Sequence, residues 1–302
     1  MFSILIFINP VSGNGKSFKI FKKAYELLQK NNLVDVHITK KETNITHLLE
    51  LTHNIEQYNL IVGIGGDGIM FEIINALQNL ELNIPIAQIP AGSGNGYFKS
   101  LTYQTKQEYS IETAIDIINR HNRYMFTDLL YITNNKKTKH YFSRLSISWG
   151  FISSVDIHTE WLRKIGSFRF TLGVLWNIYK KINYKGVLEY KNDNEWHTIK
   201  SDQFIYFWAC NTSHPSYDTI IAPESKVDDG LIDISYIIGP ISRCELLQLF
   251  VTMDTKHPKL RRIRTKEFRL TTENGLIVVD GEQIKEKEID VTNLQKISKI
   301  IY

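Results

Sequence analysis

Three glycine-rich loops, each placed directly after a short apolar run, constrain the fold of this chain more than any other feature. The loops cover residues 9–17, 63–68 and 90–96, and the runs before them have the length of buried strands. Helical periodicity follows the first two loops, and strands that alternate with helices form a parallel sheet covered on both faces. Because the carboxyl ends of parallel strands share one edge, the sequence predicts that the three loops meet there.

The composition of these loops is typical of phosphate-binding turns. Glycine lets the backbone approach a ligand closely, and a helix N-terminus offers unpaired N–H groups to an anion. The first loop ends like a Walker A motif, but Pro10 stands where that motif has its first glycine. The second loop spells G-x-G-x-x-G, yet the acidic residue expected ~20 positions later in a dinucleotide fold is missing. One such loop is readily a tight turn, whereas three together predict a nucleotide site.

The second loop also carries a candidate catalytic carboxylate. Asp67 follows Gly65 and Gly66 and precedes Gly68, at a predicted strand-to-helix turn. A helix cap would also place an aspartate there, but caps seldom need three neighbouring glycines. We therefore expect Asp67 to act on a substrate.

The pattern of the chain changes near residue 123. Beyond it, seven runs are typical of strands, and the stretches 156–164, 172–181 and 242–254 have helical periodicity. We predict an α/β plus all-β protein with an N-terminal three-layer α/β/α nucleotide-binding domain over residues 1–123. A C-terminal antiparallel β-sandwich with helical insertions would span residues 124–302, with a cleft between the domains. The strands predicted for the second domain are 124–133, 141–148, 186–190, 204–211, 231–237, 268–272 and 276–280.

Charge and composition exclude several classes of protein. The 302 residues include 36 Lys+Arg and 32 Asp+Glu, and the net charge of +4 is too small to favour a nucleic-acid partner. Two cysteines, Cys210 and Cys244, are too few for a disulfide scaffold and favour a reducing cytoplasm. The apolar runs fall short of the ~20 residues of a membrane-spanning helix. We expect a cytoplasmic protein with transient peripheral membrane association.

Several motifs, in order along the chain, resemble the diacylglycerol kinase-type catalytic domain of lipid kinases, and within that superfamily the sphingosine kinases. Gly65-Gly66-Asp67-Gly68 with Glu72 is one of them, and the longest runs from residue 146 to residue 173. The other motifs lie at residues 9–15, 90–95, 222–230 and 279–282, so the resemblance extends from residue 3 to about residue 290. The chain departs from sphingosine kinases at Ser154, where they have one of two acidic residues.

The resemblance implies an ATP-dependent lipid kinase that uses Mg²⁺ and phosphorylates the primary hydroxyl of sphingosine or a related sphingoid base. It implies that Asp67 is the catalytic base. The residues implied in nucleotide binding are Asn9, Pro10, Val11, Ser12, Gly13, Thr39, Glu72, Gly92, Ser93, Gly94, Arg163, Arg169, Asp280, Gly281 and Glu282. The residues implied in lipid binding are Gly65, Gly66, Asp67, Gly68, Ser146, Phe151, Ile152 and Asp156.

Simple chemistry adds reasons for some of these roles. Arg163 and Arg169 offer planar guanidinium groups that suit phosphate oxygens. A sphingoid base carries an ammonium group that needs a carboxylate partner when desolvated, and Asp156, at the start of a predicted helix, is the candidate. The alternative for Asp156 is a row of ion pairs on a solvated surface. Asp228 and Asp229 would order Mg²⁺ through water, or shape a turn.

Three other functions remain open at this point. A kinase of a neutral lipid such as diacylglycerol is the nearest alternative, and Asp156 is the feature that discriminates it. An NAD kinase shares the Gly-Gly-Asp-Gly loop but does not account for residues 146–173. A non-catalytic lipid-binding protein is the third, and the presence of Asp67, Glu72 and all three loops argues against it.

Overall fold

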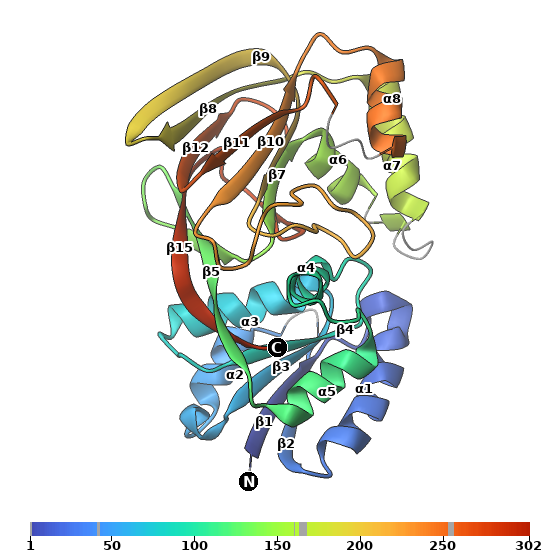
Figure 1. Cartoon of the computed structure of the whole chain (residues 1–302), viewed down its shortest axis with the longest axis vertical. Coiled ribbons are helices and arrows are strands. Elements are labelled where there is room, and N and C mark those ends of the chain that lie inside the picture. Colours follow the sequence, from blue (N-terminus) through green and yellow to red (C-terminus); the bar gives the residue numbers. More distant parts are fainter. Residues whose placement is uncertain (1, 41–42, 160, 163–167, 253–256) are drawn as a thin grey trace.

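A computed structural model of the chain describes residues 2–40, 43–159, 161–162, 168–252 and 257–302. Its N-terminal half is an α/β domain and its C-terminal half is a mostly antiparallel β domain that carries three helices on one side (Figure 1). The predicted combination of an α/β domain with a β domain is therefore confirmed.

Four parallel strands form the sheet of the N-terminal domain, in the order β4-β3-β1-β2. They are β1 (Phe2–Ile8), β2 (Asn32–Ile38), β3 (Leu60–Gly65) and β4 (Ile86–Pro90). Every residue of β3 and β4 is buried, which explains why their sequences are almost entirely apolar rather than alternating, with Gln88 as the polar exception.

Helices cover both faces of this sheet, which gives three layers. Apolar residues of α1 and α5 pack on one face, and those of α2 and α3 pack on the other. A fifth helix, α4, follows the third glycine loop, and neither α2 nor α4 was predicted from the sequence. The helices are α1 (Lys16–Leu28), α2 (Ile45–Leu51), α3 (Asp67–Asn79), α4 (Gly96–Gln104) and α5 (Ile111–Arg120), with short 3-10 turns η1 (Ser12–Gly15) and η2 (Ile55–Gln57).

The C-terminal domain surrounds a second core in which four buried rings, Trp149, Phe204, Phe207 and Phe268, contact one another in a chain. Its strands pair antiparallel. They are β5 (Tyr124–Asn134), β6 (His140–Ser143), β7 (Ser146–Gly150), β8 (Tyr184–Asn192), β9 (Glu195–Cys210), β10 (Ile232–Ile238), β11 (Arg261–Thr265), β12 (Glu267–Thr272), β13 (Ile277–Val279), β14 (Glu282–Ile284) and β15 (Glu288–Ile301). The helices are α6 (Phe151–His158), α7 (Phe168–Lys180) and α8 (Arg243–Thr252).

The last strand, β15, joins the two domains. It runs antiparallel to β5 and β12, and Ile300 near its end pairs with Ile86 of the N-terminal sheet. The strands of both domains consequently lie on one hydrogen-bonded path, and the ribbon of β15 passes from one domain into the other (Figure 1). The sequence analysis predicted no strand in this segment.

Two predicted elements have different boundaries in the structure. The strand predicted over residues 141–148 is two strands, β6 and β7, because the chain turns at Arg144 and Leu145 to donate hydrogen bonds to Asp280. The helix predicted over 156–164 begins earlier, at Phe151, directly after Gly150, whose φ of 80° lies in the left-handed region. Asp156 therefore lies in the last turn of α6 and not at its start.

Candidate active site

The three glycine loops meet at the carboxyl edge of the N-terminal sheet, as predicted, and contact one another through backbone. A Cβ atom at Gly92 would lie 2.3 Å from the Cα of Gly66, and one at Gly13 would lie 2.5 Å from the carbonyl oxygen of Ala91. A Cβ at Gly65 would lie 3.2 Å from the Oγ of Ser12. Side chains are excluded at Gly92 and Gly13 because another loop already fills the space.

The first loop is fixed by its own hydrogen bonds. The backbone N–H of Val11 donates to the Asn9 side chain at 3.2 Å, and the Ser17 hydroxyl donates to the Asn9 carbonyl at 2.8 Å. Val11 is 77% exposed, so its side chain is free to contact a ligand. Thr39 is buried beside this loop and donates to the carbonyl of Ile8 at 3.0 Å.

Asp67 begins α3, and the first turn of α4 holds its carboxylate. The backbone N–H of Gly96 donates to Oδ2 at 3.0 Å, and that of Tyr97 donates to Oδ1 at 3.4 Å. Gly94 lies beside the same carboxylate, since a Cβ there would be 3.0 Å from Oδ2. Burial raises the pKa of Asp67 to about 6, against the two backbone hydrogen bonds, which lower it. At neutral pH Asp67 is a partly desolvated carboxylate.

The third loop is closed by Asn95 and touches the C-terminal domain. The Asn95 side chain accepts a hydrogen bond from the N–H of Gly92 at 3.0 Å and donates to its carbonyl at 2.8 Å. The N–H of Tyr217, from the other domain, donates to the Gly94 carbonyl at 2.8 Å. Ser93 is exposed at the tip of this loop. The candidate site consequently lies at the junction of the two domains.

Asp280 ties the β6–β7 turn to the site. It is 5% exposed, and its carboxylate accepts hydrogen bonds from the hydroxyl of Ser143 at 2.6 Å and from the N–H of Ser146 at 2.9 Å. The N–H groups of Arg144 and Leu145 donate to it as well. Four donors on one carboxylate explain how a buried aspartate is held at the positive φ of 50°. Asp280 here shapes the backbone of the site.

The next two residues extend from that turn toward both halves of the site. A Cβ at Gly68 would lie 3.2 Å from Oε1 of Glu282, and a Cβ at Gly281 would lie 3.9 Å from Oδ2 of Asp156. Glu72 faces Glu282 as well, because the charge of Glu282, after burial, raises the pKa of Glu72. Gly68 and Glu282, which are 214 positions apart in the sequence, are therefore neighbours.

Asp156 and Arg169 form a partly buried pair on α6 and α7. The Arg169 guanidinium lies 3.5 Å from Oδ1 of Asp156, and the side chains are 7% and 30% exposed respectively. The guanidinium also lies over the ring of Phe170, 4.3 Å from its centroid. Asp156 thus belongs to the junction. Glu160 and Arg163, the other members of the alternative row of ion pairs, lie outside the described residues.

The residues expected to contact the lipid chain lie in an apolar cluster among α6, α7 and α8. Phe151 is 3% exposed and stacks on Phe250, with ring centroids 4.4 Å apart, and Ile152 packs against the same cluster. Ser146 accepts a hydrogen bond from the indole N–H of Trp208 at 3.0 Å. Side chains of the protein itself fill the interior of this cluster in the structure.

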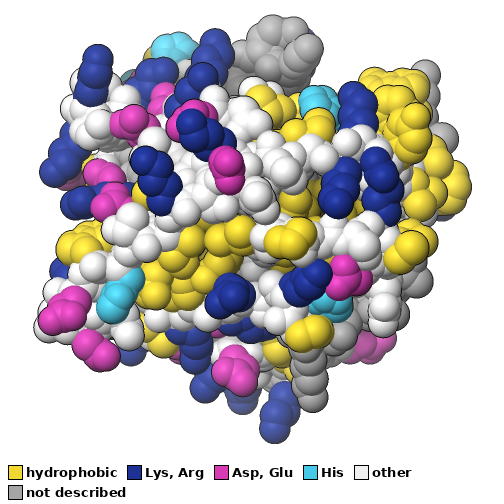
Figure 2. All heavy atoms as spheres, turned by 90° about the horizontal axis from the view of Figure 1, so that it is seen from above, with side chains coloured by type: hydrophobic (Ala, Val, Ile, Leu, Met, Phe, Trp, Pro, Cys, Tyr) yellow, Lys and Arg dark blue, Asp and Glu magenta, His cyan; other side chains and the backbone are white. Residues whose placement is uncertain are grey.

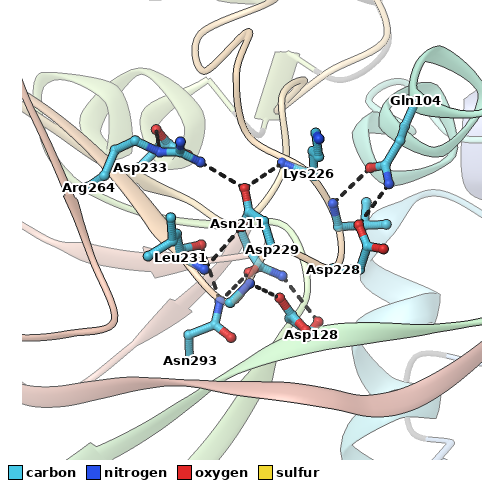
Figure 3. A network of polar contacts seen from close by, with 12 residues as sticks. Gln104, Asp128, Asn211, Lys226, Asp228, Asp229, Leu231, Asp233, Arg264 and Asn293 are labelled. Carbon is cyan, nitrogen blue, oxygen red and sulfur yellow. Dashed lines mark hydrogen bonds and ion pairs between the residues drawn. The ribbon is translucent and has the colours of Figure 1, made fainter.

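Asp228 and Asp229 lie in a polar network at the end of α4 (Figure 3). Asp228 accepts from the Gln104 side chain at 2.8 Å, and Asp229 pairs with Arg264 at 2.7 Å. Gly230, at a φ of 72°, completes the turn and donates its N–H to buried Asp128. Both aspartates have protein partners, and Asp228 connects the second domain to α4. Among the described residues no group of three or more His, Cys, Asp and Glu is placed to hold a metal ion.

Two residues at the site gave no clear signal in the sequence. Arg144 is 2% exposed and Tyr97 is 1% exposed, and both lie beside Asp67 and Asp280. A charged residue inside a run of residues that otherwise reads as a buried strand was the available sign for Arg144. For Tyr97 the available sign was the third loop, because a glycine-rich loop after a strand often leads into a helix, and Tyr97 lies in the first turn of that helix.

Comparison with known proteins matches both halves of the chain. Residues 3–126 match the diacylglycerol kinase catalytic domain, and residues 146–297 match the YegS C-terminal NAD kinase beta sandwich-like domain. The chain is 25% identical to sphingosine kinase 1 of Homo sapiens, over 92% of this chain and 85% of that protein. It is 27% identical to sphingoid long chain base kinase 4 of Schizosaccharomyces pombe (strain 972 / ATCC 24843), over 92% of this chain and 70% of that protein.

The fold has relatives among solved structures. A crystal structure of a diacylglycerol kinase from Bacillus anthracis str. Sterne superposes with a TM-score of 0.73 at 19% sequence identity, and the match covers 99% of this chain and 96% of the other. At that identity the similarity shows the fold. Together with the two domain matches, it places this chain in the diacylglycerol kinase-type family of lipid kinases.

Proposed function

We propose that this protein transfers the γ-phosphoryl group of ATP to the primary hydroxyl of a sphingoid base, with Asp67 as the general base. One observation carries the proposal: the same junction holds three backbone loops suited to a triphosphate, a partly desolvated carboxylate and the Asp156–Arg169 pair. The sphingosine and sphingoid-base kinases to which the chain is similar support the choice of acceptor.

The three loops fit a triphosphate. Backbone N–H groups of the loops and of the first turn of α3 can donate to phosphate oxygens, whereas those of Gly96 and Tyr97 at the start of α4 already bind Asp67. Asn9, Ser12 and Gly13 would contact the nucleotide from one side. Arg169 pairs with Asp156, which lies beside Gly281, and we propose that a change of rotamer brings its guanidinium to a phosphate oxygen.

A divalent cation fits this site as an ion that arrives with the nucleotide. Carboxylates at the described part of the junction are spread over several elements and are not grouped as a metal centre. Magnesium retains waters and is commonly held by substrate phosphates with one or two carboxylates. When bound, it would neutralise charge on the phosphoryl oxygens.

Asp67 has the position and the pKa of a base for this reaction. A pKa of about 6 leaves the carboxylate ionised at neutral pH, yet more basic than an exposed aspartate. The hydrogen bonds from Gly96 and Tyr97 orient it, and a hydroxyl between it and the loops would lose its proton to Oδ1 or Oδ2. Phosphoryl transfer does not need a strong base, because the proton is removed late in a loose transition state.

The Asp156–Arg169 pair offers a means of choosing an amine. The ammonium group of a sphingoid base would bind the Asp156 carboxylate, and displaced Arg169 would turn toward phosphate. Diacylglycerol has no charge at that position, so it would form no ion pair with Asp156. Phe151 and Ile152 lie about one turn before Asp156 on the same helix, so the alkyl chain of a bound sphingoid base would meet the apolar cluster among α6, α7 and α8.

Access to lipid is proposed to come from an apolar surface on α7. No helix among the described residues is long and apolar enough to cross a bilayer. However, apolar side chains gather at the side of the molecule where α7 and α8 lie, with Lys and Arg side chains beside them (Figure 2). The exposed apolar residues on and next to α7 are Trp161, Phe168, Leu172, Leu175, Trp176, Tyr179 and Ile182. We propose that this α7 surface contacts the membrane.

The test is phosphorylation of sphingosine and of diacylglycerol, competed in one mixed-micelle assay with labelled ATP. We expect sphingosine to be the preferred acceptor and Asp67→Asn to lose about 100-fold or more of the turnover with nearly unchanged ATP affinity. Preference for diacylglycerol would show that the protein is a neutral-lipid kinase. Turnover near wild type in Asp67→Asn would show that Asp67 is not the general base.

A further inference from the structure

Arg144 is a buried cation without a hydrogen-bonded partner for its charge. Its residue is 2% exposed, and Nε, Nη1 and Nη2 have no hydrogen-bond partner among the described residues. Its guanidinium carbon lies 3.2 Å from the centroid of the Tyr97 ring. Burying an unpaired charge is costly, so its retention indicates a compensating interaction.

We propose that Arg144 is a positioning residue for Asp67: its guanidinium lies against the ring of Tyr97, whose N–H binds that carboxylate, and its positive charge favours the ionised form of Asp67. The inference rests on the proposed function only in the assignment of Asp67 as the base. It concerns a residue in the second domain that acts on a carboxylate in the first.

The backbone around Arg144 fixes where the cation lies. The N–H of Arg144 donates to Oδ2 of Asp280 at 3.0 Å, and the N–H of Leu145 donates to Oδ1 at 3.1 Å. Tyr97 is in the first turn of α4, and its N–H donates to Asp67. The guanidinium is thus clamped between a turn that is anchored on one buried carboxylate and a helix start that binds another.

The charges that face Asp67 come from several elements. Asp280, from the turn after β13, raises its pKa, and Arg144, from the β6–β7 turn, lowers it. Tyr109, in the loop before α5, interacts with Asp67, since the Asp67 charge raises the pKa of that phenol. Glu282 of β14 lies beside Gly68. Arg144 is therefore the cation that opposes desolvation and the surrounding acidic groups.

A direct measurement is the pKa of Asp67 by ¹³C NMR of the full chain labelled at aspartate Cγ, with the resonance assigned by its loss in Asp67→Asn. In Arg144→Met, a neutral side chain of similar length, we expect this pKa to rise by about one unit. Arg144→Lys keeps the charge and should stay near wild type. Tyr97→Phe is the matched control, because it keeps the ring and removes a hydroxyl that has no hydrogen-bond partner in the described structure.

The pH–rate profile should move with the pKa. If Asp67 is the base, the acid limb of the pH–rate profile shifts to higher pH in Arg144→Met. Turnover then falls about five-fold at pH 6 and hardly changes at pH 8. A role in folding alone would lower the melting temperature and leave the Asp67 pKa and the limb in place. Should Arg144→Met fail to fold, Arg144→Gln carries the same expectation.

The outcomes separate this inference from the proposed function. An unchanged Asp67 pKa in a folded neutral variant overturns the role of Arg144, whatever the enzyme phosphorylates. A raised pKa without any lipid phosphorylation by the wild-type protein supports the role of Arg144 and contradicts the proposed function. A raised pKa with an unshifted acid limb removes Asp67 as the titrating base.

Discussion

In the N-terminal domain the candidate site is made of backbone, whereas in the C-terminal domain side chains on short helices form it. The loops that would hold ATP pack so closely that a Cβ at Gly92 would lie 2.3 Å from Gly66. On the other side, Asp156 pairs with Arg169 at 3.5 Å, and apolar rings fill the space beneath them. A backbone site is preorganised for one ligand, while a side-chain site can change rotamers to admit others. The comparison indicates that the backbone half of the site is rigid and the side-chain half adaptable.

The largest loss of turnover should come from adding a methyl group to a glycine of the three loops. Gly92→Ala places Cβ against the Cα and N atoms of Gly66, so one loop must shift, and we expect turnover to fall about 100-fold or more. Gly239→Ala, outside the three loops, is the control, because a Cβ there would lie no closer than 3.4 Å to Gln203, an ordinary contact. Steady-state turnover and ATP binding measure both. Equal loss in the two variants would contradict the rigid-loop interpretation.

A smaller effect is expected from the side-chain half. Asp156→Asn removes the charge proposed to bind the ammonium group, so the KM for sphingosine should rise about ten- to thirty-fold while ATP affinity stays unchanged. Asp290→Asn is the control, since that aspartate pairs with Arg269 at the surface of β15, with its side chain 37% exposed. An unchanged KM in Asp156→Asn would take Asp156 out of the lipid site.

The α7 surface gives a third, weaker test. Trp176 is 55% exposed, and Trp176→Asp should reduce binding to anionic vesicles about ten-fold, with turnover of a short-chain, water-soluble acceptor retained. Leu33 is equally 55% exposed but lies on β2 of the other domain, so Leu33→Asp should leave vesicle binding unchanged. Vesicle sedimentation compares the two. Loss in both variants alike would argue against a dedicated membrane surface.

The smallest effect is on stability, through the raised pKa of Asp67. Its value of about 6 in the folded protein lies above the ordinary value of 3.8, so folding favours the protonated acid and the ionised form destabilises the fold. Asp67→Asn should therefore raise the melting temperature by about 2–6 °C above pH 6. The gain should fade as the pH drops through 6 toward 4 and vanish well below 4, where the wild-type carboxyl is protonated in the unfolded state as well as in the folded one. A gain that grows at low pH would show a lowered pKa instead.

Most of the N-terminal half was predictable because its signals are local. Strand lengths, the glycine loops and the placement of Asp67 follow from residues close together in the sequence, and the structure has them as expected. The second domain was predicted as antiparallel, but β15 was missed. Its residues alternate only loosely, since Asn293, Gln295 and Lys296 interrupt the apolar pattern near the irregular register with β5. Pairing with strands far away in the chain stabilises that segment, and no window of the sequence contains that information.

The sequence by itself determined the chemistry of this protein: where glycine is required, where a carboxylate stands and which residues are apolar enough to form two cores. The tertiary structure alone decided which of those residues meet. Asp280 lies beside Asp67 because β13 and β7 pair, and Arg144 is buried because the chain turns there to bind Asp280. Side-chain identity is a local property of the chain, whereas the electrostatic environment of Asp67 depends on contacts between residues far apart in it.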